Sequence, residues 1–322
     1  MIVIIKLLIG LFIFLFAMKI MTKTLQHFSK TALNQTLQYA VSHPLKGFLF
    51  GACFTALVQS SSAITVLIVG LVEAKLLTLY QAATMIMGAN LGTTMTSQLL
   101  SLNLTAGIPF FILGGVILFL FKRPLIHHIG SFFLSFGFLF LGLHLMKLAM
   151  LPLVQSTFVV ALIEHIQYAP LLCLLLGMVL TFVIQSSSAS TAILMTLLST
   201  HAIDISTALF ILLGLEIGTC LTALLASLSG GRAGKQTALF HFMFNIIGVF
   251  LFLPFSHFFL TATHSISSSA AHHLANLQFC FNLFSILCLF PLTKSLIKII
   301  CHFFPLTATH TSSHFSKYWL IH

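Results

Sequence analysis

The stretch QSSSAIT at residues 59–65 recurs as QSSSAST at residues 185–191, and both copies interrupt long apolar runs. A glutamine followed by three serines is costly inside a bilayer, because every polar group there needs a hydrogen-bond partner. A single run of serines is common where membrane helices pack closely. Two copies in the same setting favour a functional polar turn over helix packing alone.

The composition identifies the chain as an integral membrane protein. Of its 322 residues, 59% are hydrophobic and only 6% are charged, whereas a soluble protein carries about 25% charged residues. Repeated apolar runs of about 20 residues predict an all-α membrane protein, because a barrel would show short alternating segments. The excess of 14 Lys and Arg over four acids is interpreted as a topology signal and not as nucleic-acid binding.

Other reactive side chains do not indicate an enzyme. The six cysteines lack CxxC spacing, and the pairs His127–His128 and His272–His273 lie in or near predicted loops without carboxylate or thiol partners. An intramembrane serine protease is disfavoured, because no histidine shares a predicted helix face with either QSSS. We expect no catalytic residue, no cofactor and no metal beyond a transported ion.

An internal repeat organises the chain. Shifted by 126 positions, residues 51–102 align with residues 177–228 without a gap, and 17 of the 52 positions are identical. The identities include Gln, Ser, Gly and Thr in phase, which chance resemblance between apolar helices does not produce. Each unit joins a QSSS segment to a Gly/Thr cluster, GANLGTTMTS from Gly88 and GLEIGTCLTA from Gly214.

Two segments near the C-terminus resemble each other more weakly. FHFMFNIIGVFLFLPF starts at Phe240 and LQFCFNLFSILCLFPL starts at Leu277, so that Asn245 aligns with Asn282. These asparagines fit either a binding site or hydrogen bonds between helices.

The positive charges favour one topology. If each QSSS segment is a re-entrant hairpin, 12 of the 14 Lys and Arg lie on one side, with Lys6 and Lys147 opposite. If both segments span fully, the count falls to 10 of 14. The hairpins then enter from opposite faces. We therefore predict two inverted-topology repeats, each with a re-entrant QSSS helical hairpin and a broken transmembrane helix that contains the Gly/Thr cluster.

Either QSSS turn has the chemistry of an anion site. If one half-helix ends near Gln59 and the next begins among Ser60–Ser62, the second half-helix presents free N–H groups and the positive end of its dipole. The serine hydroxyls and the glutamine amide add further donors. The candidate substrate-binding residues are Gln59, Ser60, Ser61, Ser62, Gln185, Ser186, Ser187 and Ser188.

The Gly/Thr clusters offer oxygen atoms that suit a hard cation such as sodium. Glu216 stands where the first repeat has Asn90, and it is the acid in the middle of an apolar run, whereas Glu73, Glu164 and Asp204 lie near the ends of such runs. An ionised Glu216 would attract a cation, and a protonated one would behave more like the amide. The candidate sodium-binding residues are Asn90, Thr93, Thr94, Thr96, Glu216, Thr219 and Thr222.

The N-terminal run after Lys6 lacks a small-x-small cleavage site and is expected to be an uncleaved transmembrane helix. The predicted organisation has six parts. They are a first transmembrane helix with its connecting segment (1–44), repeat 1 (45–122), a linking helix and loop (123–169), repeat 2 (170–255), C-terminal transmembrane segments (256–304) and a short tail (305–322).

A duplicated QSSS followed about 30 residues later by G-x-N-x-G-T-x-x-T resembles the type II sodium/phosphate cotransporters and their bacterial relatives. The resemblance covers roughly residues 45–300. It implies sodium-coupled phosphate symport in the plasma or inner membrane, with the two QSSS hairpins meeting near the membrane centre to bind phosphate. This agrees with the anion chemistry of half-helix ends in inverted-repeat transporters.

Two features depart from the family pattern. Glu216 occupies a place where the family usually has Asn, which leaves the ion and its stoichiometry open. Because only a short segment follows residue 304, we also expect the C-terminal regulatory domain of some bacterial relatives to be missing. Two alternatives to import remain open, namely an exporter or carrier of another oxyanion, and a membrane sensor or scaffold subunit that transports nothing.

Overall fold

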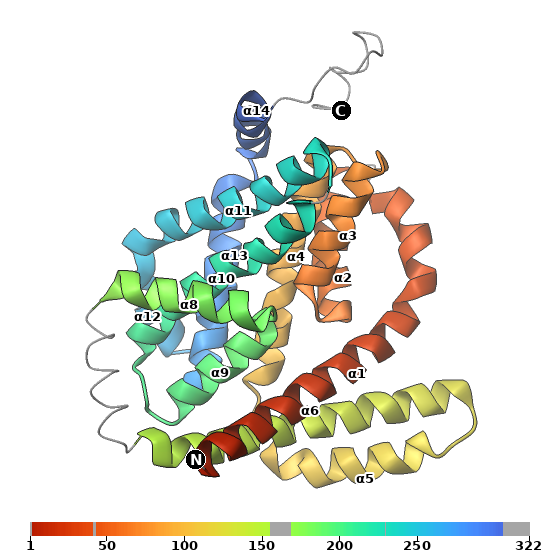
Figure 1. The fold of residues 1–322 in the computed structure, drawn as a ribbon, viewed down its shortest axis with the longest axis vertical. Helices are drawn as coiled ribbons and strands as arrows, with labels where there is room; N and C mark the ends of the chain where they lie inside the picture. Colours follow the sequence, from red (N-terminus) through yellow and green to blue (C-terminus); the bar gives the residue numbers. More distant parts are fainter. Residues whose placement is uncertain (1, 41–42, 155–168, 229, 305–322) are drawn as a thin grey trace.

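The computed structural model describes residues 2–40, 43–154, 169–228 and 230–304, and this part of the chain is helical without a strand (Figure 1). Glu164 and the predicted tail after residue 304 lie outside the described residues. The α-helices are α1 (Ile2–Ala40), α2 (Pro44–Val58), α3 (Ser61–Glu73), α4 (Leu79–Leu100), α5 (Ile108–Phe119), α6 (Pro124–Val154), α8 (Pro170–Ile184), α9 (Ser187–Ser199), α10 (Ile205–Leu228), α11 (Arg232–Phe252), α12 (Ser256–His264), α13 (Ala270–Leu289) and α14 (Thr293–Phe303). Short 3-10 turns at Thr105–Gly107 and Leu253–Phe255 precede α5 and α12.

Several of these helices can cross a membrane. Four apolar segments are long enough, and six spans result if two bent helix pairs each count as one. The first pair joins α4 to the 3-10 turn and α5 at 75°, and the second joins α13 to α14 at 78°. The four long segments are Val3–Leu25, Pro124–Pro152, Ile205–Leu228 and Arg232–His264.

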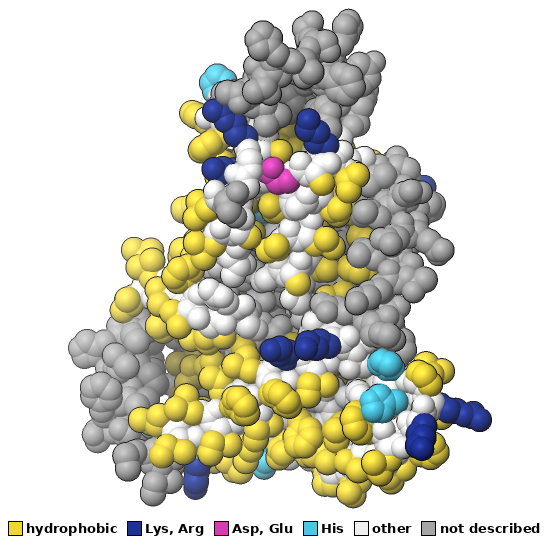
Figure 2. All heavy atoms as spheres, turned by 45° about the vertical axis from the view of Figure 1, so that its right-hand side comes forward, with side chains coloured by type: hydrophobic (Ala, Val, Ile, Leu, Met, Phe, Trp, Pro, Cys, Tyr) yellow, Lys and Arg dark blue, Asp and Glu magenta, His cyan; other side chains and the backbone are white. Residues whose placement is uncertain are grey.

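The outer surface fits a lipid environment. Large apolar side chains such as Phe12, Leu171 and Phe250 are more than two-thirds exposed, and hydrophobic side chains cover much of the face in Figure 2. A water-exposed surface with so few charges would be unfavourable. The exposed apolar side chains and the candidate spans identify a multi-pass membrane protein.

The two repeats form the same three-helix unit. In the first, α2 packs along α4 and is followed by α3; in the second, α8 packs along α10 and is followed by α9. Glycines permit the close contact, because a Cβ at Gly51 would collide with the Met85 carbonyl oxygen, and one at Gly177 with that of Ile211. The shared glycines therefore bring two backbones together, as is common between membrane helices.

The prediction that the Gly/Thr clusters break their helices is wrong. Residues 79–100 of α4 and 205–228 of α10 are continuous helix through both clusters. The glycines serve packing instead, since a Cβ at Gly88 would meet the Phe48 carbonyl oxygen and one at Gly214 that of Leu174. The bend that follows α4 lies beyond the cluster, at residues 101–104.

The N-terminal helix is placed against both repeats. α1 packs along α6, which also packs on α5. In Figure 1, α5 and α6 lie in the lower part, and α1 begins there and rises along the right-hand side. α1 also contacts α2 and α9. It therefore passes beside the ends of the two QSSS segments.

Candidate functional site

Each QSSS forms a tight turn between two short helices. The glutamine that ends the first helix adopts a left-handed backbone, with φ 57° and ψ 29° at Gln59 and φ 55° and ψ 25° at Gln185. This region costs a residue other than glycine roughly 1–2 kcal/mol. Lys75 (φ 61°) and His201 (φ 56°), again 126 positions apart, do the same after the second helix of each unit. The backbone therefore repeats as the sequence does.

The first serine of each motif caps the second helix. Ser60 Oγ accepts a hydrogen bond from the Ala63 N–H at 3.4 Å, and Ser186 Oγ accepts one from the Ala189 N–H at 3.3 Å. The prediction of a helix end near Gln59 and a new start within the serines is confirmed. The first N–H groups of α3 and α9 have no acceptor within their own helix, so they can donate to a ligand.

The two turns share one pocket. A cavity of about 360 Å³ is lined by all eight residues of the two motifs and by one stretch of α1. The lining residues are Leu15, Met18, Lys19, Thr22, Lys23, Gln59, Ser60, Ser61, Ser62, Gln185, Ser186, Ser187 and Ser188. The predicted substrate residues, 126 positions apart in sequence, are therefore brought together.

The pocket contains buried polar atoms that lack a partner within the described part of the chain. Ser61 is 4% exposed, and its Oγ makes no hydrogen bond. The Oε1 atom of Gln59 is also buried and unpaired, while its Nε2 donates to the Ala56 carbonyl at 2.6 Å. Since an unsatisfied buried polar group costs about 1–3 kcal/mol, these atoms point to a polar ligand or water.

The pocket also contains two cations, whose place in the sequence indicates only membrane topology. Lys19 and Lys23 lie on α1 and line the same cavity as the serines. Their spacing of four residues places them on one helix face, and this was the signal available in the sequence. The site thus combines hydroxyls, helix N–H groups and two positive charges.

The predicted sodium-binding residues lie elsewhere. None of the seven lines the QSSS pocket. Most of the threonine hydroxyls donate to carbonyls of their own helix, as Thr93 does to Ala89 at 2.9 Å and Thr219 to Leu215 at 2.8 Å. Thr94 and Thr222 do likewise, and Thr96 is buried.

Asn90 and Glu216 each belong to a cluster of buried, hydrogen-bonded polar side chains. Asn90 donates to Asn245 Oδ1 at 3.3 Å, and its Oδ1 lies 3.1 Å from His241 Nε2. The Glu216 carboxylate accepts from Gln278 Nε2 at 2.5 Å. Gln278 in turn accepts a hydrogen bond from Ser97.

The resemblance between α11 and α13 relates these two clusters. The shift that aligns Asn245 with Asn282 also aligns His241 with Gln278. Asn245 and Asn282 each donate to the carbonyl four residues earlier in their own helix, that of His241 and that of Gln278. Asn245 also accepts a hydrogen bond from Asn90. The second cluster therefore carries a carboxylate where the first carries an amide.

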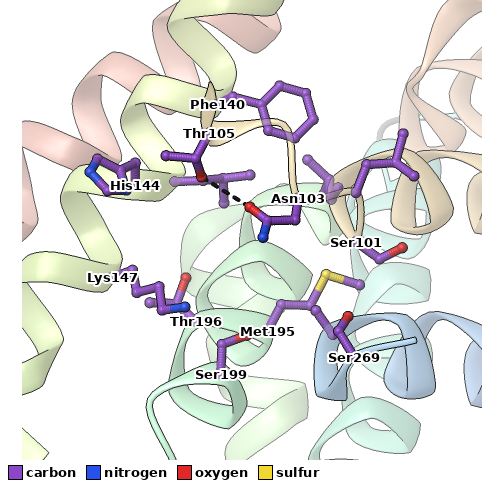
Figure 3. Close-up of a pocket in the computed structure, with 14 residues that line it drawn as sticks. Ser101, Asn103, Thr105, Phe140, His144, Lys147, Met195, Thr196, Ser199 and Ser269 are labelled. Atoms are coloured by element: carbon purple, nitrogen blue, oxygen red, sulfur yellow. Dashed lines mark hydrogen bonds between the residues drawn. The ribbon is translucent and has the colours of Figure 1, made fainter. Parts of the chain in front are cut away.

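A second pocket, of about 160 Å³, opens at the C-terminal ends of α4 and α9 (Figure 3). His144 and Lys147 reach it from α6, and Thr196 and Ser199 from α9. Its hydrogen bond from Thr105 Oγ1 to Asn103 Oδ1 measures 3.2 Å. Its lining includes no residue of either QSSS, so the candidate site remains the pocket between the two turns.

The model of the Na⁺/Pi-cotransporter family matches residues 13–148 and 150–286. The chain belongs to this family. Both QSSS turns and both Gly/Thr clusters fall within the matched ranges. The resemblance stated from the motifs is therefore confirmed.

Similar proteins extend from bacteria to human. YqeW of Bacillus subtilis (strain 168) is 34% identical over 287 residues, which are 89% of this chain and 94% of that protein. YjbB of Escherichia coli (strain K12), named as a candidate inorganic phosphate exporter, is 28% identical over 267 residues; these are 83% of this chain and 49% of YjbB. Human sodium-dependent phosphate transport protein 2B is 42% identical over 87 residues, 26% of this chain and 13% of that protein. No solved structure matches the chain.

Proposed function

We propose that this family member is a secondary active transporter that moves inorganic phosphate together with sodium across the cell membrane. One observation carries the proposal: both QSSS turns line a single pocket. Each turn supplies hydroxyls and helix N–H groups suited to an oxyanion. Phosphate binds between the turns, and movement of the surrounding helices exposes it to alternate sides.

Sodium is proposed to bind at the predicted Gly/Thr residues. The strongest support is Glu216, a buried carboxylate whose hydrogen-bond partner Gln278 is neutral. A carboxylate inside a membrane protein normally pairs with a cation or marks an ion pathway. The full proposed set is Asn90, Thr93, Thr94, Thr96, Glu216, Thr219 and Thr222.

Export is a second candidate, because the name of the relative YjbB describes phosphate export. The same site serves either direction, since the ion gradients decide net flux. Uptake and efflux of labelled phosphate in proteoliposomes, with the sodium gradient imposed in each direction, distinguish the two. Arsenate and sulfate as competitors test whether another oxyanion is preferred.

The decisive experiment is phosphate uptake into proteoliposomes with and without a sodium gradient. We expect sodium-dependent uptake by the wild-type chain and its loss in the double variant Ser61→Ala plus Ser187→Ala. A control removes Ser135 and Ser227, buried hydroxyls that donate to carbonyls of their own helices. Undiminished uptake by the first double variant contradicts the site, and absence of wild-type flux in either direction contradicts the function.

A further inference from the structure

Two lysines of a helix outside both repeats share a pocket with the two QSSS turns. Lys19 and Lys23 are exposed side chains of α1, and both line the pocket that contains the serines. Thr22, between them in sequence, lines it as well. Three segments thus line the pocket, and among its described lining residues the lysines are the only charged ones.

Among the described residues that line the pocket, no acid offsets this charge. The acidic residues in the described part of the chain are Glu73, Asp204 and Glu216, and none is a lining residue. Two like charges four residues apart on a helix repel each other. An anion bound between them and the serines removes that repulsion and gains two attractive interactions.

The lysines also mark the side of the membrane on which this end of α1 lies, as charges near helix ends often do. That role alone does not require them to face the serines. Lys6, on the same helix, also serves as a topology marker but does not line the pocket. Lys19 and Lys23 line the same pocket as unpaired Ser61 Oγ and two helix N-termini, and this shared position calls for an additional role.

We propose that Lys19 and Lys23 are substrate-binding residues that select a doubly charged tetrahedral oxyanion. This rests on the proposed phosphate site between the QSSS turns. The serines and helix N–H groups supply donors for the oxyanion, and the two ammonium groups match the charge of the phosphate dianion. Charge balance at the substrate then comes from the protein itself, so phosphate binds without sodium in contact with it.

The test is equilibrium binding of labelled phosphate to the purified chain in detergent, where both faces are accessible and orientation is irrelevant. We expect K19Q/K23Q to weaken phosphate binding at least tenfold and K19R/K23R to retain most of it. Lys6→Gln is the matched control on α1 and leaves binding unchanged. Thermal unfolding of each variant verifies that it is folded.

Selectivity separates a binding role from a structural one. Sulfate, a dianion, is expected to compete with phosphate far better than nitrate in the wild-type chain, and K19Q/K23Q reduces this preference. Equal phosphate affinity and equal selectivity in wild type and K19Q/K23Q overturn the inference while leaving the phosphate site intact. A wild-type chain that binds no phosphate refutes the proposed function instead.

Discussion

In the first repeat the carboxylate of Glu73, at the end of α3, accepts a hydrogen bond from the backbone N–H of Gly234 in the first turn of α11. The equivalent residues are Ser199 and Ala271. Ser199 lies 126 positions after Glu73, at the end of α9, and Ala271 lies 37 positions after Gly234, in the first turn of α13. These two residues line the open pocket of Figure 3. The end of α3 is thus hydrogen-bonded to α11, whereas the equivalent residues of α9 and α13 line a pocket.

The two halves are alike where they meet and different at their far ends. At the centre, both turns have the same left-handed glutamine and the same serine cap. At the ends, a carboxylate at a helix N-terminus forms a charge-assisted contact that a serine cannot reproduce. The symmetric centre is where phosphate is proposed to bind, and the units differ only away from it.

The largest expected effect comes from the shared packing, which both halves need equally. Gly51→Leu and Gly177→Leu each insert a side chain where a Cβ already collides with a carbonyl oxygen. We expect each to cost about 3 kcal/mol of stability, measured by thermal unfolding in detergent.

Gly70→Leu is the matched control, because nothing lies within 4 Å of a Cβ there. It should unfold near the wild-type temperature. If either Gly51→Leu or Gly177→Leu also unfolds near the wild-type temperature, the two repeats do not depend on the same backbone contact.

The next effect is unequal between the halves. Glu73→Ala removes the acceptor of the Gly234 N–H, and loss of a hydrogen bond to a charged group costs about 1.5–3 kcal/mol. Ser199→Ala removes a side chain that faces a pocket and should change stability by less than about 0.5 kcal/mol. If thermal unfolding shows that Glu73→Ala and Ser199→Ala lose the same stability, the ends of α3 and α9 do not differ in this way.

The smallest effect concerns the charge that distinguishes Glu216 from Asn90. Glu216→Gln keeps an acceptor for Gln278 but removes the charge. If this carboxylate binds sodium, the sodium concentration for half-maximal phosphate uptake rises about tenfold, equivalent to ~1.4 kcal/mol. Uptake is measured over a sodium series in proteoliposomes.

Asp204→Asn controls for the loss of a negative charge on the same structural unit. Asp204 Oδ1 caps α10 by accepting from the Thr207 N–H at 2.8 Å, and asparagine is an equally good cap. Its sodium dependence should match the wild type. If the phosphate uptake of Glu216→Gln also depends on sodium as the wild type does, Glu216 is not part of the sodium site.

The sequence predicted the polar turns well, because their structure is local. A serine at a helix start and a glutamine just before it define a cap and a break, and the repetition of both in phase removes the ambiguity. The meeting of the two turns followed from the family resemblance, and the pocket at Gln59 and Gln185 agrees with it.

Three features could not be predicted from residue patterns. Glycine and threonine in a membrane helix fit a break as well as they fit close packing, and here Gly88 and Gly214 serve packing. Lys19 and Lys23 belong to neither repeat, so only the tertiary path of α1 places them at the site. The long-range bond between Asn90 and Asn245 likewise depends on helix packing and not on spacing in the chain.

The central claim is that the two QSSS turns form one shared phosphate site, and the stoichiometry of binding tests it most directly. Labelled phosphate at saturation should bind to the purified wild-type chain at one per chain. Ser61→Ala and Ser187→Ala should each weaken that single binding event without halving the number of sites. Two phosphates per chain, with one lost in each single variant, would show two separate sites and contradict the account.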